Sequence, residues 1–366
     1  MSKVLFINHT NDLFGAERAL LKVAKASGLR PEDVTFIEPA YLREDTFAPA
    51  VKAAGYGLRR MHYKNLGTSW WRSMLVLVYN LPAVWRVVRM VKRDKIDCIW
   101  SNTSLGCLGI VAARWAGVRH VWHIHEPAET DHDYVPELSG LYRRLFAYRR
   151  NTVVFVTRAQ QQRWETLYPE ALKGKSRWIY TPADLYTRHR VADDVYRFGY
   201  IGSWSRRKNL VRLVEAFGDV HRQHPDTELV LTDNIGDDAQ AVRQAITRLP
   251  KPQAVRILQV TNAQAFYDQI DVVVLPSLNE TWGIVIPEAM QQGIATIVTE
   301  HTDLREIAQD GVHTLYIHPQ NTRSIRDAME RMCDNAYRER IAKAGADMIK
   351  NIDLNGQFVQ QVQQLV

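Results

Sequence analysis

The sequence predicts an α/β fold in which two parallel sheets are each wrapped by helices. Strand-like and helix-like segments alternate along almost the whole chain, which is the pattern of βαβ units. A polar stretch at 181–194 interrupts the alternation once, and the pattern restarts at Tyr196. The chain has 366 residues, of which 46% are hydrophobic, and this is enough for more than one core. We therefore expect two domains, at 1–185 and 186–366.

The expected strands of the first half are short apolar runs, and the expected helices between them have apolar residues at helical spacing. Helices are expected at 16–26 and 105–116. Strands are expected at 4–8, 34–38, 96–101, 120–125 and 152–156.

The second half repeats the pattern and ends in a helical segment. Strands are expected at 197–202, 228–232, 254–258, 272–275 and 295–298. In the final segment, 355–366, four apolar residues recur at helical spacing: Phe358, Val359, Val362 and Leu365. We expect a docked terminal helix in the second domain and not a tail.

Cysteine usage and the first residues bear on the cellular compartment. Cys98, Cys107 and Cys333 have no paired spacing and form no zinc signature. A reducing, cytoplasmic environment is therefore favoured over secretion with disulfides. Residues 1–8 lack a long apolar core followed by a small-residue cleavage site, so they read as a first strand and not as a signal peptide.

The segment 70–95 combines basic and aromatic residues in a chain of net charge +7. Its apolar run is too often interrupted to span a bilayer. Helices with Trp and basic residues lie in membrane interfaces, and a basic stretch at 142–150 would add to the attraction for anionic lipid. Ordinary amphipathic helices with solvated arginines fit the pattern as well. Nucleic acid is not an expected partner, because no recognition motif accompanies the charge.

Two glutamates, Glu280 and Glu288, lie eight positions apart at a predicted junction of strand and helix. The run 271–275 is almost wholly aliphatic and ends at Pro276, as a buried parallel strand does. Glu280 follows in the loop, and apolar residues from Ile284 onward fit a helix that contains Glu288. The first free backbone N–H groups of such a helix would face an anion. This arrangement suits a nucleotide sugar.

The residues around these glutamates resemble the retaining glycosyltransferases of family 4, whose GT-B architecture has two facing Rossmann-like domains and an interdomain cleft. The family pattern is proline-serine, a glutamate, an aromatic-glycine pair, and a second glutamate followed by Ala-Met. This chain has Pro276-Ser277, Glu280, Trp282-Gly283 and Glu288-Ala289-Met290. The resemblance extends to 202–209, where the family places a glycine and a phosphate-binding lysine, and more weakly to 15–18, 122–126 and 180–184.

The resemblance implies a role for each of these residues toward a nucleoside-diphosphate sugar. Glu288 would accept hydrogen bonds from the ribose hydroxyls. Glu280 would lie near the transferred sugar and its departing phosphate, and Lys208 would offset the negative charge on the leaving diphosphate. From spacing alone, each of the three also fits a solvated surface residue. The remaining donor-site residues would be Gly202, Ser203, Arg207, Trp282, Gly283 and Ile284, with Ser203 in place of the family's usual arginine.

In the first half, His125 ends an expected strand, where the family often places a histidine against the donor sugar. The period of two along a strand puts His123 on the same side. Gly15 would let the backbone approach the phosphates or the acceptor closely. A structural histidine and an ordinary helix-start glycine fit these residues too. No metal site is predicted, because further ligands at suitable spacing are lacking, and the metal-like motif at 131–133 reads as a coincidence.

The resemblance implies metal-independent transfer of a sugar, with retention at the anomeric carbon, to a glycan or lipid-linked acceptor in cell-surface polysaccharide or glycolipid biosynthesis. The nucleotide sugar is a substrate, and no cofactor is expected. The enzyme would work in the cytoplasm, at the inner face of the membrane if the segment 70–95 binds lipid. Two alternatives stay open, partly because of Ser203: a non-catalytic nucleotide-sugar-binding subunit or scaffold of a polysaccharide assembly complex, and a sugar-nucleotide hydrolase or epimerase.

Overall fold

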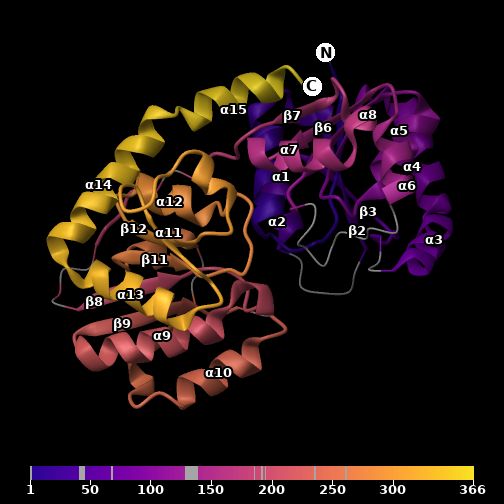
Figure 1. Cartoon of the computed structure of the whole chain (residues 1–366). Coiled ribbons are helices and arrows are strands. Elements are labelled where there is room, and N and C mark those ends of the chain that lie inside the picture. The colour runs from indigo at the N-terminus through magenta and orange to yellow at the C-terminus, as the bar shows by residue number, and fades with distance from the viewer. Residues whose placement is uncertain are drawn as a thin grey trace. The chain divides into compact units, whose positions relative to one another are not determined.

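The chain forms two α/β units, each built on one parallel sheet (Figure 1). One unit comprises Met1–Thr181 with Asn355–Val366, and the other comprises Pro182–Leu354. The expected fold class, with two domains on parallel sheets, is confirmed. The structure is a computed structural model, and it describes residues 2–40, 46–66, 69–127, 139–184, 186–190, 193, 195–234, 236–259 and 262–366.

The sheet of the first unit has seven strands, and each neighbouring pair is parallel. The strand order reverses between β1 and β4, and doubly wound sheets bind ligands at the carboxyl ends of such a switch point. In spatial order the strands are β3 (Gly57–Met61), β2 (Val34–Pro39), β1 (Val4–Ile7), β4 (Cys98–Asn102), β5 (Arg119–Ile124), β6 (Asn151–Phe155) and β7 (Ser176–Trp178).

Alternate residues of β1 face different cores. Val4 and Phe6 pack with the helices α1, α2 and α15, whereas Leu5 and Ile7 pack with α4 and α5. Both faces of the sheet are therefore covered, as a parallel sheet requires. The helices are α1 (Gly15–Ala26), α2 (Phe47–Ala53), α3 (Trp70–Tyr79), α4 (Leu81–Asp94), α5 (Cys107–Ala116), α6 (Ser139–Phe146), α7 (Arg158–Leu167), α8 (Pro169–Leu172) and α15 (Leu354–Gln363).

The sheet of the second unit has six parallel strands, and its order reverses between β8 and β11. Its strands are β10 (Val255–Leu258), β9 (Thr227–Thr232), β8 (Tyr196–Tyr200), β11 (Val272–Leu275), β12 (Ala295–Thr299) and β13 (Leu315–Ile317). Its helices are α9 (Leu210–Gln223), α10 (Ala239–Thr247), α11 (Ala263–Tyr267), α12 (Val285–Gln291), α13 (Thr322–Cys333) and α14 (Asn335–Asn351).

The terminal helix α15 belongs to the first unit. Phe358 and Val362 are buried in the same core as residues of α1 and α2, and Figure 1 shows the yellow helix returning to these elements. The sequence predicted the helix and its docking but assigned 355–366 to the second domain. Helical spacing identifies the face that is buried, but it does not identify the domain that buries it.

Candidate functional site

The predicted donor-site residues of the second unit lie on two loops at its switch point. One loop follows β8 and contains Gly202 and Lys208, and the other follows β11 and contains Glu280. Because β8 and β11 are parallel neighbours, their carboxyl ends meet at one edge of the sheet. Residues that are 72 positions apart in sequence therefore come into contact.

Lys208 and Glu280 form an ion pair at this edge. Lys208 Nζ lies 2.5 Å from Glu280 Oε2, and the two side chains are only 15% and 12% exposed. The hydroxyl of Ser277 donates to the same carboxylate oxygen at 3.3 Å. Burial alone would raise the pKa of Glu280, but the charges of Lys208 and Arg207 and the hydrogen bonds from Lys208 and Ser277 outweigh it, so this pKa lies below its ordinary value. Glu280 is therefore a carboxylate at neutral pH.

Two glycines let the loops approach this pair closely. Gly283 has φ 58°, and a Cβ there would lie 3.1 Å from Cγ of Glu280. Gly202 has φ 147°, and a Cβ there would lie 2.7 Å from the hydroxyl of Tyr200, which donates to the carbonyl of Ser203. Any side chain at either position would meet both backbone strain and a clash.

The residues that flank Lys208 join the two loops. Asn209 is 4% exposed and left-handed, and its side-chain amide donates to the carbonyl of Pro276 at 3.0 Å. Arg207 Nη1 donates to the carbonyl of Asn279 at 3.1 Å. By contrast, Arg206 is 80% exposed, with its Nε 4.0 Å from Asp237. Of the two arginines after Ser203, Arg207 is thus the one that lies beside the Glu280 loop.

Glu288 lies in α12 and is fully buried. The hydroxyl of Tyr267 donates to its Oε2 at 2.8 Å. The alternative of a solvated glutamate in a first helical turn is therefore wrong. Trp282, which precedes this helix, is 4% exposed, so its ring packs within the unit. Ile284 is the residue before α12.

In the first unit, His125 follows β5 and is held by Asn102, which ends β4. The distance from His125 Nε2 to Asn102 Oδ1 is 2.9 Å, and Asn102 Nδ2 donates to Oδ1 of Asn8 and to the carbonyl of Ala16. Because that nitrogen is engaged, Oδ1 faces the ring and His125 carries its proton on Nε2. Burial, with smaller contributions from His123 and His9, holds the pKa of His125 well below its ordinary value. The imidazole is thus neutral, with Nδ1 as an acceptor.

A second polar pair of the first unit, His9 and Glu17, lies at the switch point between β1 and β4. Nδ1 of His9 lies 3.0 Å from Glu17, which is 1% exposed in the first turn of α1. The backbone N–H of Phe14 donates to the same carboxylate at 3.2 Å. Gly15 lies between them, and a Cβ added there would have no atom within 4 Å. The described fold therefore does not itself require glycine at this position.

His123 lies on the same side of β5 as His125, as the strand period predicted, with ring centroids 4.2 Å apart. It is 1% exposed, and within the described residues neither ring nitrogen has a hydrogen-bond partner. Burial lowers its pKa to about 3. His123 is therefore a neutral, unsatisfied core residue.

Among the described residues, one cluster has donor atoms close enough to share a metal ion. Glu300, His301 and His318 place one ligand atom each within 4.8 Å of one another, and both histidines are exposed. Two imidazoles and a carboxylate suit a first-row divalent ion. The carbonyl of His301 also accepts from the backbone N–H of Glu280 at 2.9 Å. The motif at 131–133 lies outside the described residues.

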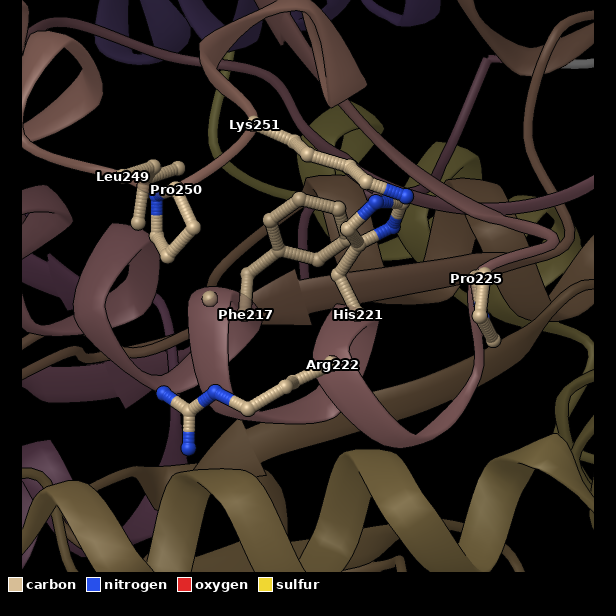
Figure 2. A pocket seen from close by; sticks show the side chains of 8 residues that line it. Phe217, His221, Arg222, Pro225, Leu249, Pro250 and Lys251 are labelled. Atoms are coloured by element: carbon tan, nitrogen blue, oxygen red, sulfur yellow. The ribbon is translucent and has the colours of Figure 1, made fainter.

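Two cavities of the second unit lie away from these residues. One, of about 130 Å³, is small and largely apolar, and Figure 2 shows Phe217 and His221 projecting from α9 toward Leu249 and Lys251. The other, of about 460 Å³, is lined by residues at the starts of β8 and β9, at the opposite edge of the sheet from Glu280. Neither cavity is lined by a residue of the candidate site.

Two family models match almost the whole chain in succession. The model for glycosyltransferase family 4 matches 15–186, and the model for glycosyl transferases group 1 matches 187–348. The boundary between the two matches is close to the boundary between the two structural units.

Two curated glycosyltransferases are similar to this chain in sequence, and one solved structure is similar to it in fold. An uncharacterized glycosyltransferase of Methanocaldococcus jannaschii is 29% identical over 41% of this chain and 39% of that protein. The capsular polysaccharide biosynthesis glycosyltransferase CapM of Staphylococcus aureus is 22% identical over 44% of this chain and 43% of that protein. These matches span less than half of either relative. The structure of HepE from Anabaena in complex with UDP-glucose has the same fold, with a TM-score of 0.80, 19% identity and coverage of 100% of this chain and 98% of that one.

Proposed function

Because the chain belongs to the group 1 glycosyltransferases of family 4, with the GT-B fold, we propose that it transfers a sugar from a nucleoside diphosphate to an acceptor hydroxyl with retention at the anomeric carbon. The observation that carries the proposal is the largely buried ion pair of Lys208 and Glu280 at the switch point of the second unit. A carboxylate and an ammonium at the carboxyl edge of such a sheet supply the charges that the leaving diphosphate and the reacting sugar need.

In the proposed reaction, the bond between the anomeric carbon and the diphosphate oxygen breaks, and its electron pair stays on that oxygen. Lys208 stabilises the charge that develops there, and Arg207 adds to the positive potential. Glu280, held ionised by the same cations, orients the sugar hydroxyls and stabilises the positive anomeric carbon. The acceptor oxygen then bonds to the same face of the sugar, and its proton passes to the departing diphosphate.

The other predicted residues position the donor. We propose that Glu288, fixed by Tyr267, accepts hydrogen bonds from the ribose, and that the loop backbone at Gly202, Ser203, Gly283 and Ile284 binds the diphosphate. Trp282 supports this loop from within the unit. In the first unit, we propose that neutral His125 contacts the transferred sugar, and that the backbone at Gly15 lets a ligand approach closely.

We further propose that the acceptor is a glycan or a lipid-linked sugar, in cell-surface polysaccharide or glycolipid biosynthesis. The sequence similarity to CapM supports this pathway. We expect catalysis without a metal, because Lys208 and Arg207 supply the positive charge, and we place the enzyme in the cytoplasm. The sequence contains neither a Gly-x-Ser-x-Gly nucleophile elbow nor a Gly-x-Gly-x-x-Gly cofactor loop, the motifs of hydrolases and dehydrogenases.

The test is release of nucleoside diphosphate from a panel of sugar nucleotides that begins with UDP-glucose, assayed with glycan and lipid-linked acceptors. Replacing Lys208 with Met should lower kcat by about 10²–10³, as loss of one charge-stabilising donor does. The matched control is Lys251→Met, because this exposed lysine of the same unit lies away from the site. Nuclear magnetic resonance of the product would report the anomeric configuration. Donor binding without turnover would favour the scaffold, and turnover without acceptor would favour a hydrolase.

A further inference from the structure

The helices α3 and α4 of the first unit expose several large apolar side chains between residues 70 and 85. Ten such side chains are exposed among the described residues, and seven of them lie on these two helices. Isolated exposed apolar residues are common, but a contiguous patch marks an interaction surface. The seven are between 44% and 65% exposed: Trp70, Trp71, Leu75, Val78, Tyr79, Leu81 and Trp85. We call this patch the α3–α4 surface.

The opposite face of the same helices is anchored in the protein. Val84, Val87 and Met90 of α4 are buried in the core against β1 and β4, and Figure 1 shows α3 and α4 on the same side of the unit as α5 and α6. Among the described residues, no one helix has the length and apolar character to cross a bilayer, although the two helices, bent by 47°, pass such a test jointly. Since one face of α4 is packed into the core, the folded unit leaves only the opposite face of the helix open to a partner.

The charged side chains along these two helices are positive up to the last residue of α4. Residues 69–93 contain no acidic residue and five exposed basic ones, of which Arg93 is paired with Asp94 at the end of α4, at 2.6 Å. Some of these cations lie against the aromatic rings: the guanidinium of Arg72 lies 5.2 Å from the Trp71 ring, and that of Arg89 lies 5.5 Å from the Trp85 ring. Tryptophan beside arginine is the composition of helices that lie in the headgroup region of a membrane. The five basic residues are Arg72, Arg86, Arg89, Lys92 and Arg93.

We propose that the α3–α4 surface docks the first unit on an anionic lipid bilayer, with both helices in the plane of the interface. The charge pattern selects lipid over a second copy of the chain. A symmetric dimer through this surface would place Arg72, Arg86, Arg89 and Lys92 of one copy against the same cations of the other, and residues 69–93 supply no acidic partner for them. An anionic bilayer offers both the apolar layer for the tryptophans and the negative charge for the arginines.

The second basic stretch contributes charge to this unit but no apolar surface. In α6, Tyr142 and Phe146 are buried in a core cluster, while Arg143 and Arg144 are exposed. The prediction that the basic stretch 142–150 adds to the attraction for anionic lipid therefore depends on its arginines and stays a prediction. Docking rests on α3 and α4.

Vesicle co-sedimentation of the full chain tests the proposal. Vesicles of phosphatidylcholine alone are compared with vesicles of phosphatidylcholine and phosphatidylglycerol. We expect binding to the mixed vesicles, and weaker binding when the salt rises from about 0.1 M to about 1 M, which shortens the Debye length from about 10 Å to about 3 Å. Each basic residue near the surface contributes about fivefold, so the combined variant Arg72→Gln, Arg86→Gln and Arg89→Gln should lose about 100-fold in partitioning.

The combined variant Trp70→Ser, Trp71→Ser and Trp85→Ser should also release the protein from the vesicles. Trp115→Ser is the matched control, because Trp115 is 55% exposed but lies at the end of α5, toward the amino edge of the sheet. Circular dichroism would verify that each variant is folded. Sugar-nucleotide binding by the tryptophan variant should be unchanged. A failure of the membrane-docking proposal can therefore be told apart from a failure of the proposed glycosyltransferase function.

Three results would overturn the proposal. The first is equal binding to neutral and anionic vesicles, or none to either. The second is a tryptophan variant that binds like the unaltered protein, or a Trp115 variant that loses as much. The third is a dimer in sedimentation velocity that the tryptophan variant abolishes, since the surface would then be covered by a second copy.

Discussion

The ion pair between Lys208 and Glu280 gives the sharpest prediction. Lys208 Nζ and Glu280 Oε2 are 2.5 Å apart, and both side chains are largely shielded from water. With an effective dielectric constant of about 20, the Coulomb attraction at that distance would be about 7 kcal/mol, and desolvation of the two groups offsets much of it. We expect a net coupling of about 1.5–3 kcal/mol, the range of hydrogen bonds to charged groups.

A double-mutant cycle measures this coupling. The free energy of unfolding is determined for the unaltered protein, Lys208→Met, Glu280→Gln and the double variant. The control is a second cycle with Arg206→Met, because Arg206 is a neighbouring cation that is 80% exposed and lies beside Asp237. Its coupling to Glu280 should be within about 0.5 kcal/mol of zero.

The coupling should also depend on pH with a defined sign. The folded pKa of Glu280 lies below its ordinary value, so this group stabilises the fold above the unfolded pKa of about 4.3 and loses that contribution as the pH falls through the folded pKa. Burial opposes the ionised form of Glu280, and Lys208 is a main cause of its lowered pKa, so loss of Lys208 removes much of this contribution. The cost of Lys208→Met should therefore be largest near neutral pH and should shrink on acidification. A coupling near zero at pH 7, or a cost that is the same at all pH values, would refute the reasoning.

Further predictions concern the residues around the two switch points. Tyr267→Phe should lower the free energy of unfolding by about 1.5–3 kcal/mol and weaken donor binding, since it removes a hydrogen bond to buried Glu288; unchanged calorimetric titrations would contradict this. His123→Phe should raise the free energy of unfolding at pH 7 by about 1–2 kcal/mol, because it removes two buried unsatisfied nitrogens, and a loss of stability in denaturant titrations would count against it. Burial lowers the pKa of His123 to about 3 and that of His120 to about 4, so below about pH 6.5 the unfolded chain binds more protons than the folded one. The free energy of unfolding should therefore fall as the pH drops from about 6.5, by at most about 1.4 kcal/mol per pH unit for each histidine. This slope should be shallower in the His123→Phe variant. Dialysis against EDTA should leave turnover unchanged, because Lys208 and Arg207 supply the positive charge, whereas a loss restored by Mg²⁺ would argue for a metal-dependent reaction.

Most of the strands that the sequence predicted have buried residues on both faces, the exception being β10, which has one buried residue. Residues 272–275 form β11 with the expected bounds, and all four are buried. Three of the four edge strands were missed, β3, β7 and β13, whereas the edge strand β10 was predicted at 254–258. The strand β3 contains Arg59 and Arg60 and has no buried residue, so its pattern carries no signal of a core. The strands β7 and β13 have three residues each, which is too short for a period to be recognised.

The site residues that could be predicted are likewise those whose signal is local in the sequence, whereas those that depend on distant partners were missed. Glu280 and Glu288 were predicted from their spacing around a strand end and a helix start, which is visible along the chain, and Lys208 from the family resemblance of 202–209. Tyr267, Asn209, Asn102 and Glu17 were missed, because each acts through a partner on another element. A signal was available for Asn102, since polar residues directly follow β1, at Asn8 and His9, and Asn102 ends β4 at the switch point.

Binding of a nucleoside diphosphate to the second unit tests the central claim most directly. Isothermal titration of the full chain with UDP, GDP and ADP would be compared for the unaltered protein, Lys208→Met and Glu288→Gln. At a concentration of about 100 Kd, a bound diphosphate should also stabilise the fold by about 2.7 kcal/mol. We predict that at least one diphosphate binds and that both variants weaken it. Binding that is equally tight in all three proteins, or absent for every diphosphate, would contradict the account.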